Sequence, residues 1–193
     1  MASDLKIFVL ITGVSPGGLG DALTTELLKR PHIHVLASGL KTTYLAHLPS
    51  HDRISSLQLD VTSPSSISAA VATVAGITGG QLHYLINNAG YGYMMPLLDA
   101  EAQAVKQNFE VNVFGLLAVT QAFLPLLRES KGTVVNQCSI ASLPGGRQPY
   151  IGIYCATKAA LASLNDTIRV EFAPFGVKVI LHCLMLAHEH SST

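Results

Sequence analysis

Short apolar runs alternate along the chain with longer segments of helical character. The apolar runs cover residues 5–11, 34–38, 54–59, 82–87, 132–139 and 177–183, and the helical segments cover residues 20–30, 64–75, 101–127 and 154–172. Most of the apolar runs are continuous, as in parallel strands that are covered on both faces. Strands separated by helices imply right-handed crossovers. The pattern therefore predicts an α/β fold with a doubly wound parallel sheet of about six strands, in a single domain over residues 1–193.

Two helix boundaries are marked by their residue types. Ser63 followed by Pro64 is typical of an N-cap and a first helical position. Lys29 and Arg30 place cations at a helix end, and Pro31 then stops the helix. These signals support the helical segments at residues 20–30 and 64–75.

The composition excludes several classes of protein. Of the 193 residues, 49% are hydrophobic and 12% are charged, with twelve basic and twelve acidic side chains. This balance argues against a disordered chain, a nucleic-acid partner and an anionic membrane surface. No apolar run reaches the roughly 20 residues that span a bilayer. The segment LKIFVLITGV lacks a basic region and a cleavage site, so we interpret it as a buried strand rather than a signal peptide.

The cysteines indicate the redox environment. Cys138, Cys155 and Cys183 are odd in number and show no CxxC spacing. They fit a reducing compartment and argue against a disulfide framework or a zinc site. His188, Glu189 and His190 lie in the last residues of the chain, and we interpret them as a polar terminus rather than a metal site. We predict no metal.

A glycine-rich turn joins the first strand to the first helix. It reads TGVSPGGLG over residues 12–20, and its candidate cofactor-binding residues are Gly13, Ser15, Gly17, Gly18, Leu19 and Gly20. Glycines let the backbone approach a pyrophosphate, which binds at the positive end of the following helix. The position between strand and helix favours a dinucleotide site. The alternative is a glycine-rich turn that binds nothing.

The end of the second strand bears on the choice of cofactor. NAD sites usually place a carboxylate there, to bond the ribose 2′-hydroxyl. Residues 37–42 contain no carboxylate, but they contain Lys41 and the hydroxyls of Ser38 and Thr42. These groups suit a 2′-phosphate and favour NADP over NAD. Alternatively, Lys41 is a solvated loop cation.

The candidate chemistry lies at the carboxyl ends of later strands. The fourth strand ends in Asn88, Ala89 and Gly90, and the fifth ends in Ser139. Tyr154 and Lys158 are four residues apart and share one helix face. A free phenol has a pKa of about 10, and a nearby ammonium lowers the pKa of a phenol. Tyr154 could then exchange a proton with a substrate oxygen that Ser139 fixes, while a nicotinamide carries the hydride. As an isolated pair, the two residues would be a surface contact.

Six motifs in this order resemble the short-chain dehydrogenase/reductase family over nearly the whole chain. They are TGVSPGGLG, LDV at 59–61, NNAG at 87–90, NVFG at 112–115, the strand end at Ser139, and YCATK at 154–158. The resemblance implies a Rossmann-type sheet, with Ser139, Tyr154 and Lys158 as the catalytic set. It implies that Asp60 contacts the adenine and that Asn88, Ala89 and Gly90 line the cofactor cleft. Asn112 would hold a water that relays protons through Lys158, which would also bond the nicotinamide ribose.

The chain departs from the family pattern at two internal positions. The glycine turn is one residue longer than the usual TGxxxGxG and is similar to that of fungal and yeast members that reduce acyl-dihydroxyacetone phosphate with NADPH. This similarity also favours NADP. The serine is the second departure, because Ser139 precedes Tyr154 by fifteen residues and Ser142 precedes it by twelve. We choose Ser139 because it ends the strand.

The C-terminal part departs further from the family. After residues 177–183 we find no Pro-Gly turn, so the seventh strand and the substrate lid of the family are expected to be missing. Two hypotheses follow. The first is an NADP(H)-dependent oxidoreductase that interconverts a carbonyl and an alcohol, in which Tyr154 is the general acid/base. The second is a truncated, non-catalytic nucleotide-binding remnant or partner subunit.

The sequence also suggests the substrate and the assembly. Residues 91–98, YGYMMPLL, are apolar and follow the NNAG motif, which favours a hydrophobic, lipid-like or polyketide-like substrate. Alternatively, they pack against the next helix. The segments 101–127 and 154–172 are apolar on more than one face, and the resemblance implies a homodimer or homotetramer built on them. We expect a cytoplasmic protein, with peripheral association with a lipid surface left open.

Overall fold

Six parallel strands form the centre of the molecule. The computed structural model describes residues 6–146 and 148–184. The strands are β1 (Ile7–Ile11), β2 (Ile33–Gly39), β3 (Ile54–Gln58), β4 (Tyr84–Asn87), β5 (Thr133–Ser139) and β6 (Lys178–Leu184). All neighbouring pairs are parallel and the order is β3-β2-β1-β4-β5-β6. This is the strand order of a doubly wound dinucleotide-binding sheet, so the predicted fold class is confirmed.

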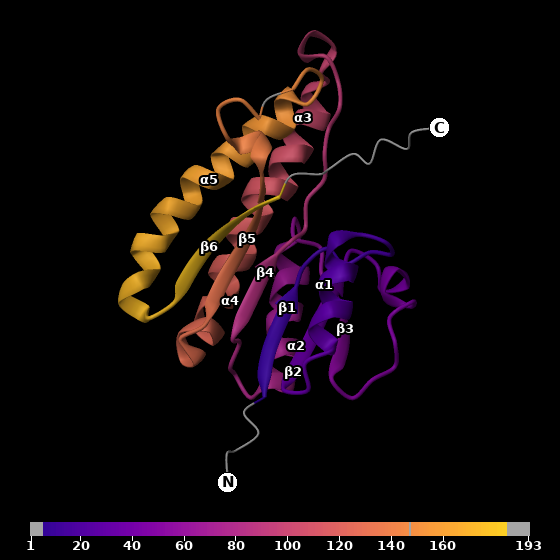
Figure 1. The fold of residues 1–193 in the computed structure, drawn as a ribbon, viewed down its shortest axis with the longest axis vertical. Helices are drawn as coiled ribbons and strands as arrows, with labels where there is room; N and C mark the ends of the chain where they lie inside the picture. Colours follow the sequence, from indigo (N-terminus) through magenta and orange to yellow (C-terminus); the bar gives the residue numbers. More distant parts are fainter. Residues whose placement is uncertain (1–5, 147, 185–193) are drawn as a thin grey trace.

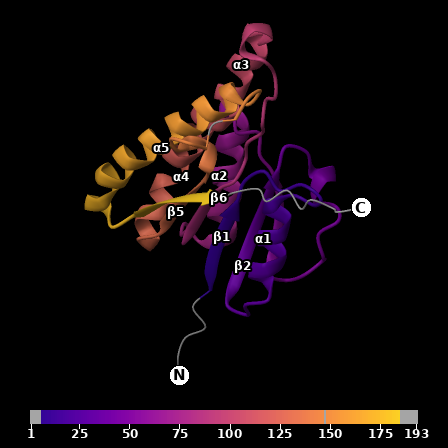
Figure 2. The same ribbon diagram turned by 45° about the horizontal axis from the view of Figure 1, so that its top comes forward.

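Helices cover both faces of the sheet. They are α1 (Leu19–Leu28), α2 (Pro64–Thr78), α3 (Ala102–Phe109), α4 (Leu116–Ser130) and α5 (Gly152–Phe172). Short 3-10 turns lie at Thr42–Leu45, Leu97–Asp99, Ile140–Ser142 and Ala173–Phe175. Helices α4 and α5 lie beside β4, β5 and β6, whereas α1 lies by β1 and β2 (Figures 1 and 2).

The hydrophobic core is divided by the sheet into two clusters. Leu10 and Leu36 belong to the cluster that contains residues of α2, α4 and α5, whereas Val9, Ile11 and Val35 pack with the apolar side of α1. Successive residues of a strand point to opposite faces, so a continuous apolar run supplies both clusters. The continuous runs in the sequence are explained by this two-sided burial.

The long helical segment expected at residues 101–127 differs from a single regular helix. It consists of α3, a π-helical stretch at Glu110–Gly115, and α4. π-Helical turns are frequent at functional sites because they shift side chains relative to a regular helix. This stretch contains Asn112. It also approaches the loop after β3 closely, because a Cβ on Gly115 would lie 2.8 Å from the Val61 carbonyl oxygen.

The same segment, Ala102–Ser130, is long and apolar enough to pass for a membrane span by length and composition. Half of its most apolar window is buried within the protein. Val119, Phe123 and Leu127 are fully buried in the core beside the sheet. We therefore assign it as a core helix.

Both predicted helix boundaries are found. The Ser63 hydroxyl accepts a hydrogen bond from the Ser66 N–H, and Pro64 is the first residue of α2. Helix α1 ends at Leu28, with Lys29 as its C-cap. The predictions for the segment after Leu184, including His188 and His190, fall on residues outside the described ranges.

Candidate active site

The glycine turn lies against the end of β4. Gly13 has a φ of +69°, and a Cβ there would lie 2.6 Å from the Ala89 Cα. A Cβ on Gly20 would lie 2.8 Å from the Asn88 side-chain nitrogen. Gly13 requires glycine, because a larger residue would meet the Ala89 backbone in a left-handed conformation, whereas a side chain at Gly20 would displace the Asn88 amide.

Asn88 holds this arrangement together. Its side-chain nitrogen donates to the carbonyl oxygens of Thr12, at 2.8 Å, and Gly13, at 3.1 Å. The Thr12 hydroxyl accepts from the backbone N–H groups of Asn88 and Ala89. Asn88 therefore joins the turn to β4 rather than reaching toward a ligand with its amide nitrogen.

The start of α1 leaves backbone donors available. Within residues 6–146 and 148–184, the N–H groups of Leu19 and Gly20 have no hydrogen-bond partner. Gly18 is the N-cap of α1 and provides no side-chain cap. Unpaired N–H groups at a helix N-terminus form an anion site, aided by the helix dipole. The turn thus fits a pyrophosphate.

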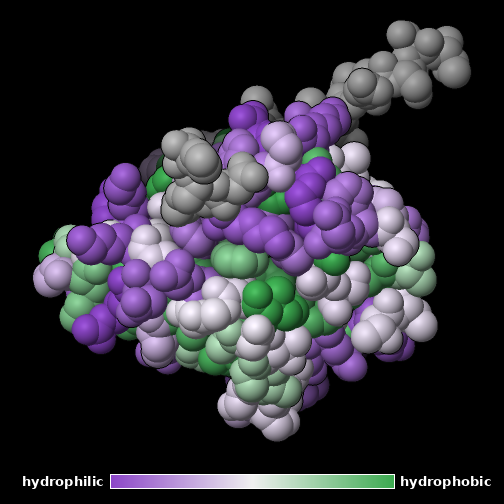
Figure 3. Space-filling view, turned by 90° about the horizontal axis from the view of Figure 1, so that it is seen from below, coloured by the Kyte–Doolittle hydropathy of each residue, from purple (hydrophilic) through white to green (hydrophobic). Residues whose placement is uncertain are grey.

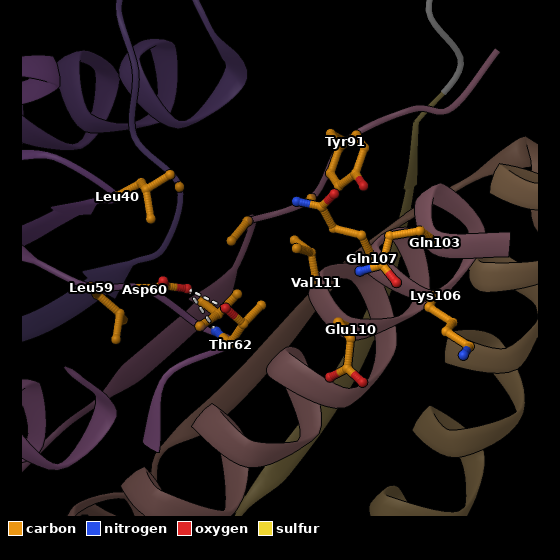
Figure 4. Close-up of a pocket in the computed structure, with 14 residues that line it drawn as sticks. Leu40, Leu59, Asp60, Thr62, Tyr91, Gln103, Lys106, Gln107, Glu110 and Val111 are labelled. Atoms are coloured by element: carbon orange, nitrogen blue, oxygen red, sulfur yellow. Dashed lines mark hydrogen bonds between the residues drawn. The ribbon is translucent and has the colours of Figure 1, made fainter. Parts of the chain in front are cut away.

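A cavity of about 800 Å³ extends along the same edge of the sheet. Figure 4 shows that Asp60 and Thr62 lie on one side of it and that Tyr91, Gln107 and Val111 lie on the other. The Asp60 carboxylate accepts from both the backbone N–H and the hydroxyl of Thr62, at 2.9 and 2.7 Å. The other residues that line this cavity are Gly13, Leu40, Leu59, Val61, Ala89, Gly90, Gln103, Lys106 and Glu110. A cavity of this size suits the adenosine half of a dinucleotide.

The predicted 2′-phosphate contacts are only partly available. Ser38 is fully buried, and its hydroxyl donates to the Ile11 carbonyl oxygen at 2.9 Å, so it cannot serve a phosphate. Lys41 is exposed and precedes the 3-10 turn at Thr42–Leu45, while Leu40 lines the cavity. The role of Lys41 stays a prediction.

A second cavity, of about 260 Å³, adjoins the first at Gly90 and Tyr91. It brings together Ser139 from β5 with Tyr154 and Lys158 from α5. Ser139 was preferred over Ser142 on sequence grounds, and the structure places Ser139 in this cavity. The Ser142 hydroxyl instead donates to the Ser139 carbonyl oxygen at 2.8 Å.

Ionisation in this cavity differs from the sequence-based expectation. Burial raises the pKa of Tyr154, and this effect exceeds the lowering of the pKa by the Ser139 hydroxyl. Burial lowers the pKa of Lys158, whose ammonium donates to the Gln137 carbonyl oxygen at 2.8 Å. The pKa of Tyr154 is therefore raised in this structure, whereas the sequence pattern predicts a lowered one. Burial of the phenol is the largest cause of this shift.

Asn112 is buried beside this cavity, in the π-helical stretch. Its side chain accepts from the Tyr91 N–H at 3.0 Å and donates to the Tyr91 carbonyl oxygen at 2.9 Å. It also donates to the Thr157 hydroxyl at 3.1 Å. Asn112 therefore ties the loop after β4 to α5, a positioning role that the sequence did not suggest. The water relay through Lys158 stays a prediction.

The opposite end of the molecule, at the amino ends of the strands, carries hydrophilic and hydrophobic side chains intermixed (Figure 3). Among the described residues no group of three or more His, Cys, Asp or Glu side chains could hold a metal ion. The two cavities that contain the candidate residues lie at the carboxyl edge of the sheet, where doubly wound folds bind their ligands.

The family model for short chain dehydrogenases matches residues 7–187. The chain belongs to the short-chain dehydrogenase family. A short-chain dehydrogenase, PC-15, from Penicillium crustosum is 48% identical over 174 residues, which are 89% of this chain and 62% of that protein. The NADPH-dependent 1-acyldihydroxyacetone phosphate reductase of Schizosaccharomyces pombe is 38% identical, over 89% of this chain and 57% of its own length. The chain thus spans less than two thirds of these relatives.

A solved short-chain dehydrogenase supports the same assignment. The protein from Burkholderia cenocepacia, in complex with NADP, superposes with a TM-score of 0.80 at 30% identity, over 92% of this chain and 71% of its own. The family is one of oxidoreductases, and the solved relative from Burkholderia cenocepacia holds NADP.

Proposed function

We propose that the chain is an NADP(H)-dependent oxidoreductase that interconverts a carbonyl and an alcohol on a hydrophobic substrate. The observation that carries the proposal is the cavity shared by Ser139, Tyr154 and Lys158, which adjoins the larger cavity beside the glycine turn. A nicotinamide bound across the two cavities would supply the hydride, which no side chain can transfer.

The cofactor would be held along the carboxyl edge of the sheet. The free N–H groups of Leu19 and Gly20 would bind the pyrophosphate, and Asp60 would face the adenine. The NADPH-dependent fission-yeast relative and the NADP complex from Burkholderia support NADP as the cofactor. Lys41, adjacent to the cavity-lining Leu40, is the candidate cation for the 2′-phosphate.

Tyr154 would act as the general acid in reduction. Its phenol would give its proton to the carbonyl oxygen of the substrate as the hydride reaches the carbon, and would take a proton back from solvent. The raised pKa of Tyr154 keeps the phenol protonated, which is the form that reduction needs. The Ser139 hydroxyl would hold the substrate oxygen, and Lys158 would line the same cavity while bonded to the Gln137 carbonyl oxygen.

The substrate class is inferred from the loop that follows the NNAG motif and contributes Tyr91 and Gly92 to the smaller cavity. The loop that begins at Tyr91 exposes Met94, Leu97 and Leu98, with exposed fractions of 74%, 64% and 101%. Its Met95 N–H donates to the Tyr150 carbonyl oxygen at 2.7 Å, which joins it to the loop before α5. The first two residues of this loop line the smaller cavity, and its exposed apolar side chains suit an acyl chain or another hydrophobic substrate.

We also propose that the chain self-associates through α4 and α5. Phe114, just before α4, and Val170, on α5, expose 54% and 73% of their surface. Such apolar residues on long helices favour a helix–helix interface between copies.

The experiment is a titration of the protein with NADPH and NADH, followed by nicotinamide fluorescence, and then turnover of a long-chain acyl ketone followed at 340 nm. Saturable NADPH binding and oxidation that depends on the ketone are expected. Binding without turnover of any hydrophobic carbonyl would reject the catalytic assignment. Failure of a folded protein to bind either nucleotide would reject the cofactor site.

A further inference from the structure

The additional residue of the glycine turn is held by a side chain of α1. Gly17 has a φ of +70°, and its N–H donates to a carboxylate oxygen of Asp21 at 3.0 Å. A Cβ at Gly17 would meet no atom within 4 Å. Glycine is needed here for the backbone conformation, not for space, and the carboxylate stabilises that conformation.

The second oxygen of the same carboxylate is also engaged. His47 lies 2.9 Å away through Nε2, and it follows the 3-10 turn Thr42–Leu45 after β2. Both side chains are largely covered, with exposed fractions of 32% for His47 and 20% for Asp21. The pair therefore connects the glycine turn, the first turn of α1 and the loop after β2.

The carboxylate remains ionised in this setting. The hydrogen bond from His47 lowers the pKa of Asp21, and the Gly17 N–H lowers it further. A carboxylate in the first turn of a helix interacts favourably with the helix dipole. Asp21 thus uses the Gly17 N–H, while the N–H groups of Leu19 and Gly20 stay free for a ligand.

We propose that Asp21 and His47 are positioning residues for the cofactor, which hold the lengthened glycine turn in the shape that presents the Leu19 and Gly20 amides to the pyrophosphate. This inference rests on the proposed nucleotide site. Asp21 acts through the turn and does not itself touch the anion, because both of its oxygens already have partners.

The test compares Asp21→Ala, Asp21→Asn and His47→Ala with the unmodified protein. NADPH affinity is measured by fluorescence titration, and exchange of the Gly17 amide hydrogen is measured by NMR. Asp21→Ala is expected to weaken NADPH binding about tenfold and to accelerate Gly17 exchange, because a charge-assisted hydrogen bond is lost. Asp21→Asn keeps an acceptor oxygen and is expected to stay within about threefold.

Asp52→Ala is the matched control. It removes another His–Asp contact, in which His51 lies 2.7 Å from a carboxylate that is 86% exposed. That variant is expected to change neither NADPH affinity nor Gly17 exchange. If Asp21→Ala folds poorly, the milder His47→Ala must weaken NADPH binding by about threefold for the inference to hold.

Two outcomes overturn the inference separately from the proposed function. Unmodified protein that binds NADPH while Asp21→Ala binds equally well would reject the positioning role alone. Unchanged Gly17 exchange in Asp21→Ala would also reject it, with or without nucleotide. Failure of the unmodified protein to bind NADPH would reject the proposed function, whatever the exchange result.

Discussion

Lys158 donates its ammonium to the Gln137 carbonyl oxygen at 2.8 Å and lies 5.7 Å from the centre of the Tyr154 ring. The lysine is 5% exposed, so its charge is largely removed from water. Burial lowers the pKa of Lys158 and is unfavourable for folding. A lysine buried in such a position is a candidate for function rather than for stability.

Lys158→Met should separate a role of this lysine in function from a role in stability. Methionine fills a similar volume without a charge, so we expect the melting temperature to change by no more than a few degrees. The proposed turnover should fall by roughly a hundredfold or more, because the cavity loses its cation. Steady-state kinetics measure the turnover and thermal melts measure the stability. Lys178→Met is the control, because Lys178 is exposed. Full activity in Lys158→Met would remove this lysine from the catalytic set.

Tyr154 should titrate above the ordinary range of a tyrosine in the protein without cofactor. Burial raises the pKa of its phenol, so the phenolate should form only above about pH 10. An ultraviolet difference titration of the unmodified protein against Tyr154→Phe isolates this one phenol among six tyrosines. A step below pH 9 would instead show that Lys158 dominates, as the sequence alone suggested.

Tyr154→Phe also tests the chemistry. Loss of the phenolic proton should reduce turnover by about 10²–10⁴-fold while leaving NADPH affinity within a few fold. The fold should be preserved, because phenylalanine keeps the ring that packs in the cavity. Parallel losses of affinity and turnover would point to a structural role for the ring.

The sequence predicted the elements well and the electrostatics poorly, for a physical reason. Continuous apolar runs report burial on both faces, so six strands could be placed from them. The i, i+4 spacing put Tyr154 and Lys158 on one helix face. It could not show that Gln137 from β5 would hold the ammonium, or that burial would dominate both pKa values, because these depend on distant segments.

The same limit applies to the side chains around the glycine turn. Asn88 lines the smaller cavity, in keeping with its motif, but the motif could not show that its amide nitrogen bonds the carbonyl oxygens of Thr12 and Gly13. Asp21 and His47 escaped notice because they are 26 residues apart and no motif contains them. Two residues that meet only after folding leave no local signal in one sequence.

Gly13→Ala should damage both fold and nucleotide binding. The new Cβ would meet the Ala89 Cα at 2.6 Å, in a backbone conformation that alanine rarely adopts. Destabilisation of about 2–4 kcal/mol is expected, together with loss of NADPH binding. Denaturant unfolding and fluorescence titration measure the two effects.

Gly76→Ala is the matched glycine control. Gly76 lies within α2, and a Cβ there would meet no atom within 4 Å. Alanine is the better helix former, so this variant should be more stable by about 0.5–1 kcal/mol and bind NADPH normally. Equal behaviour of the two variants would contradict the close approach of the turn to β4.

Two histidines beside Phe8, His34 and His83, are expected to make the stability of the fold depend on pH in the acid range. The ring centres of His34 and His83 lie 5.7 and 5.9 Å from that of Phe8. Burial lowers the pKa of both imidazoles. The His83 Nδ1 accepts the Phe8 N–H at 3.1 Å, which requires that this nitrogen carry no proton.

Because the folded-state pKa of each imidazole lies below the unfolded value near 6.5, the unfolded chain takes up protons first. The stabilisation is therefore complete above pH 6.5 and is lost as the pH falls through the lowered values. The double variant His34→Gln/His83→Gln lacks both titrations. Between pH 7.5 and 5.5 its melting temperature should therefore fall by ~2–4 °C less than that of the unmodified protein. His51→Gln, at an exposed position, should retain the original dependence. An unchanged slope in the double variant would mean that other groups govern acid unfolding.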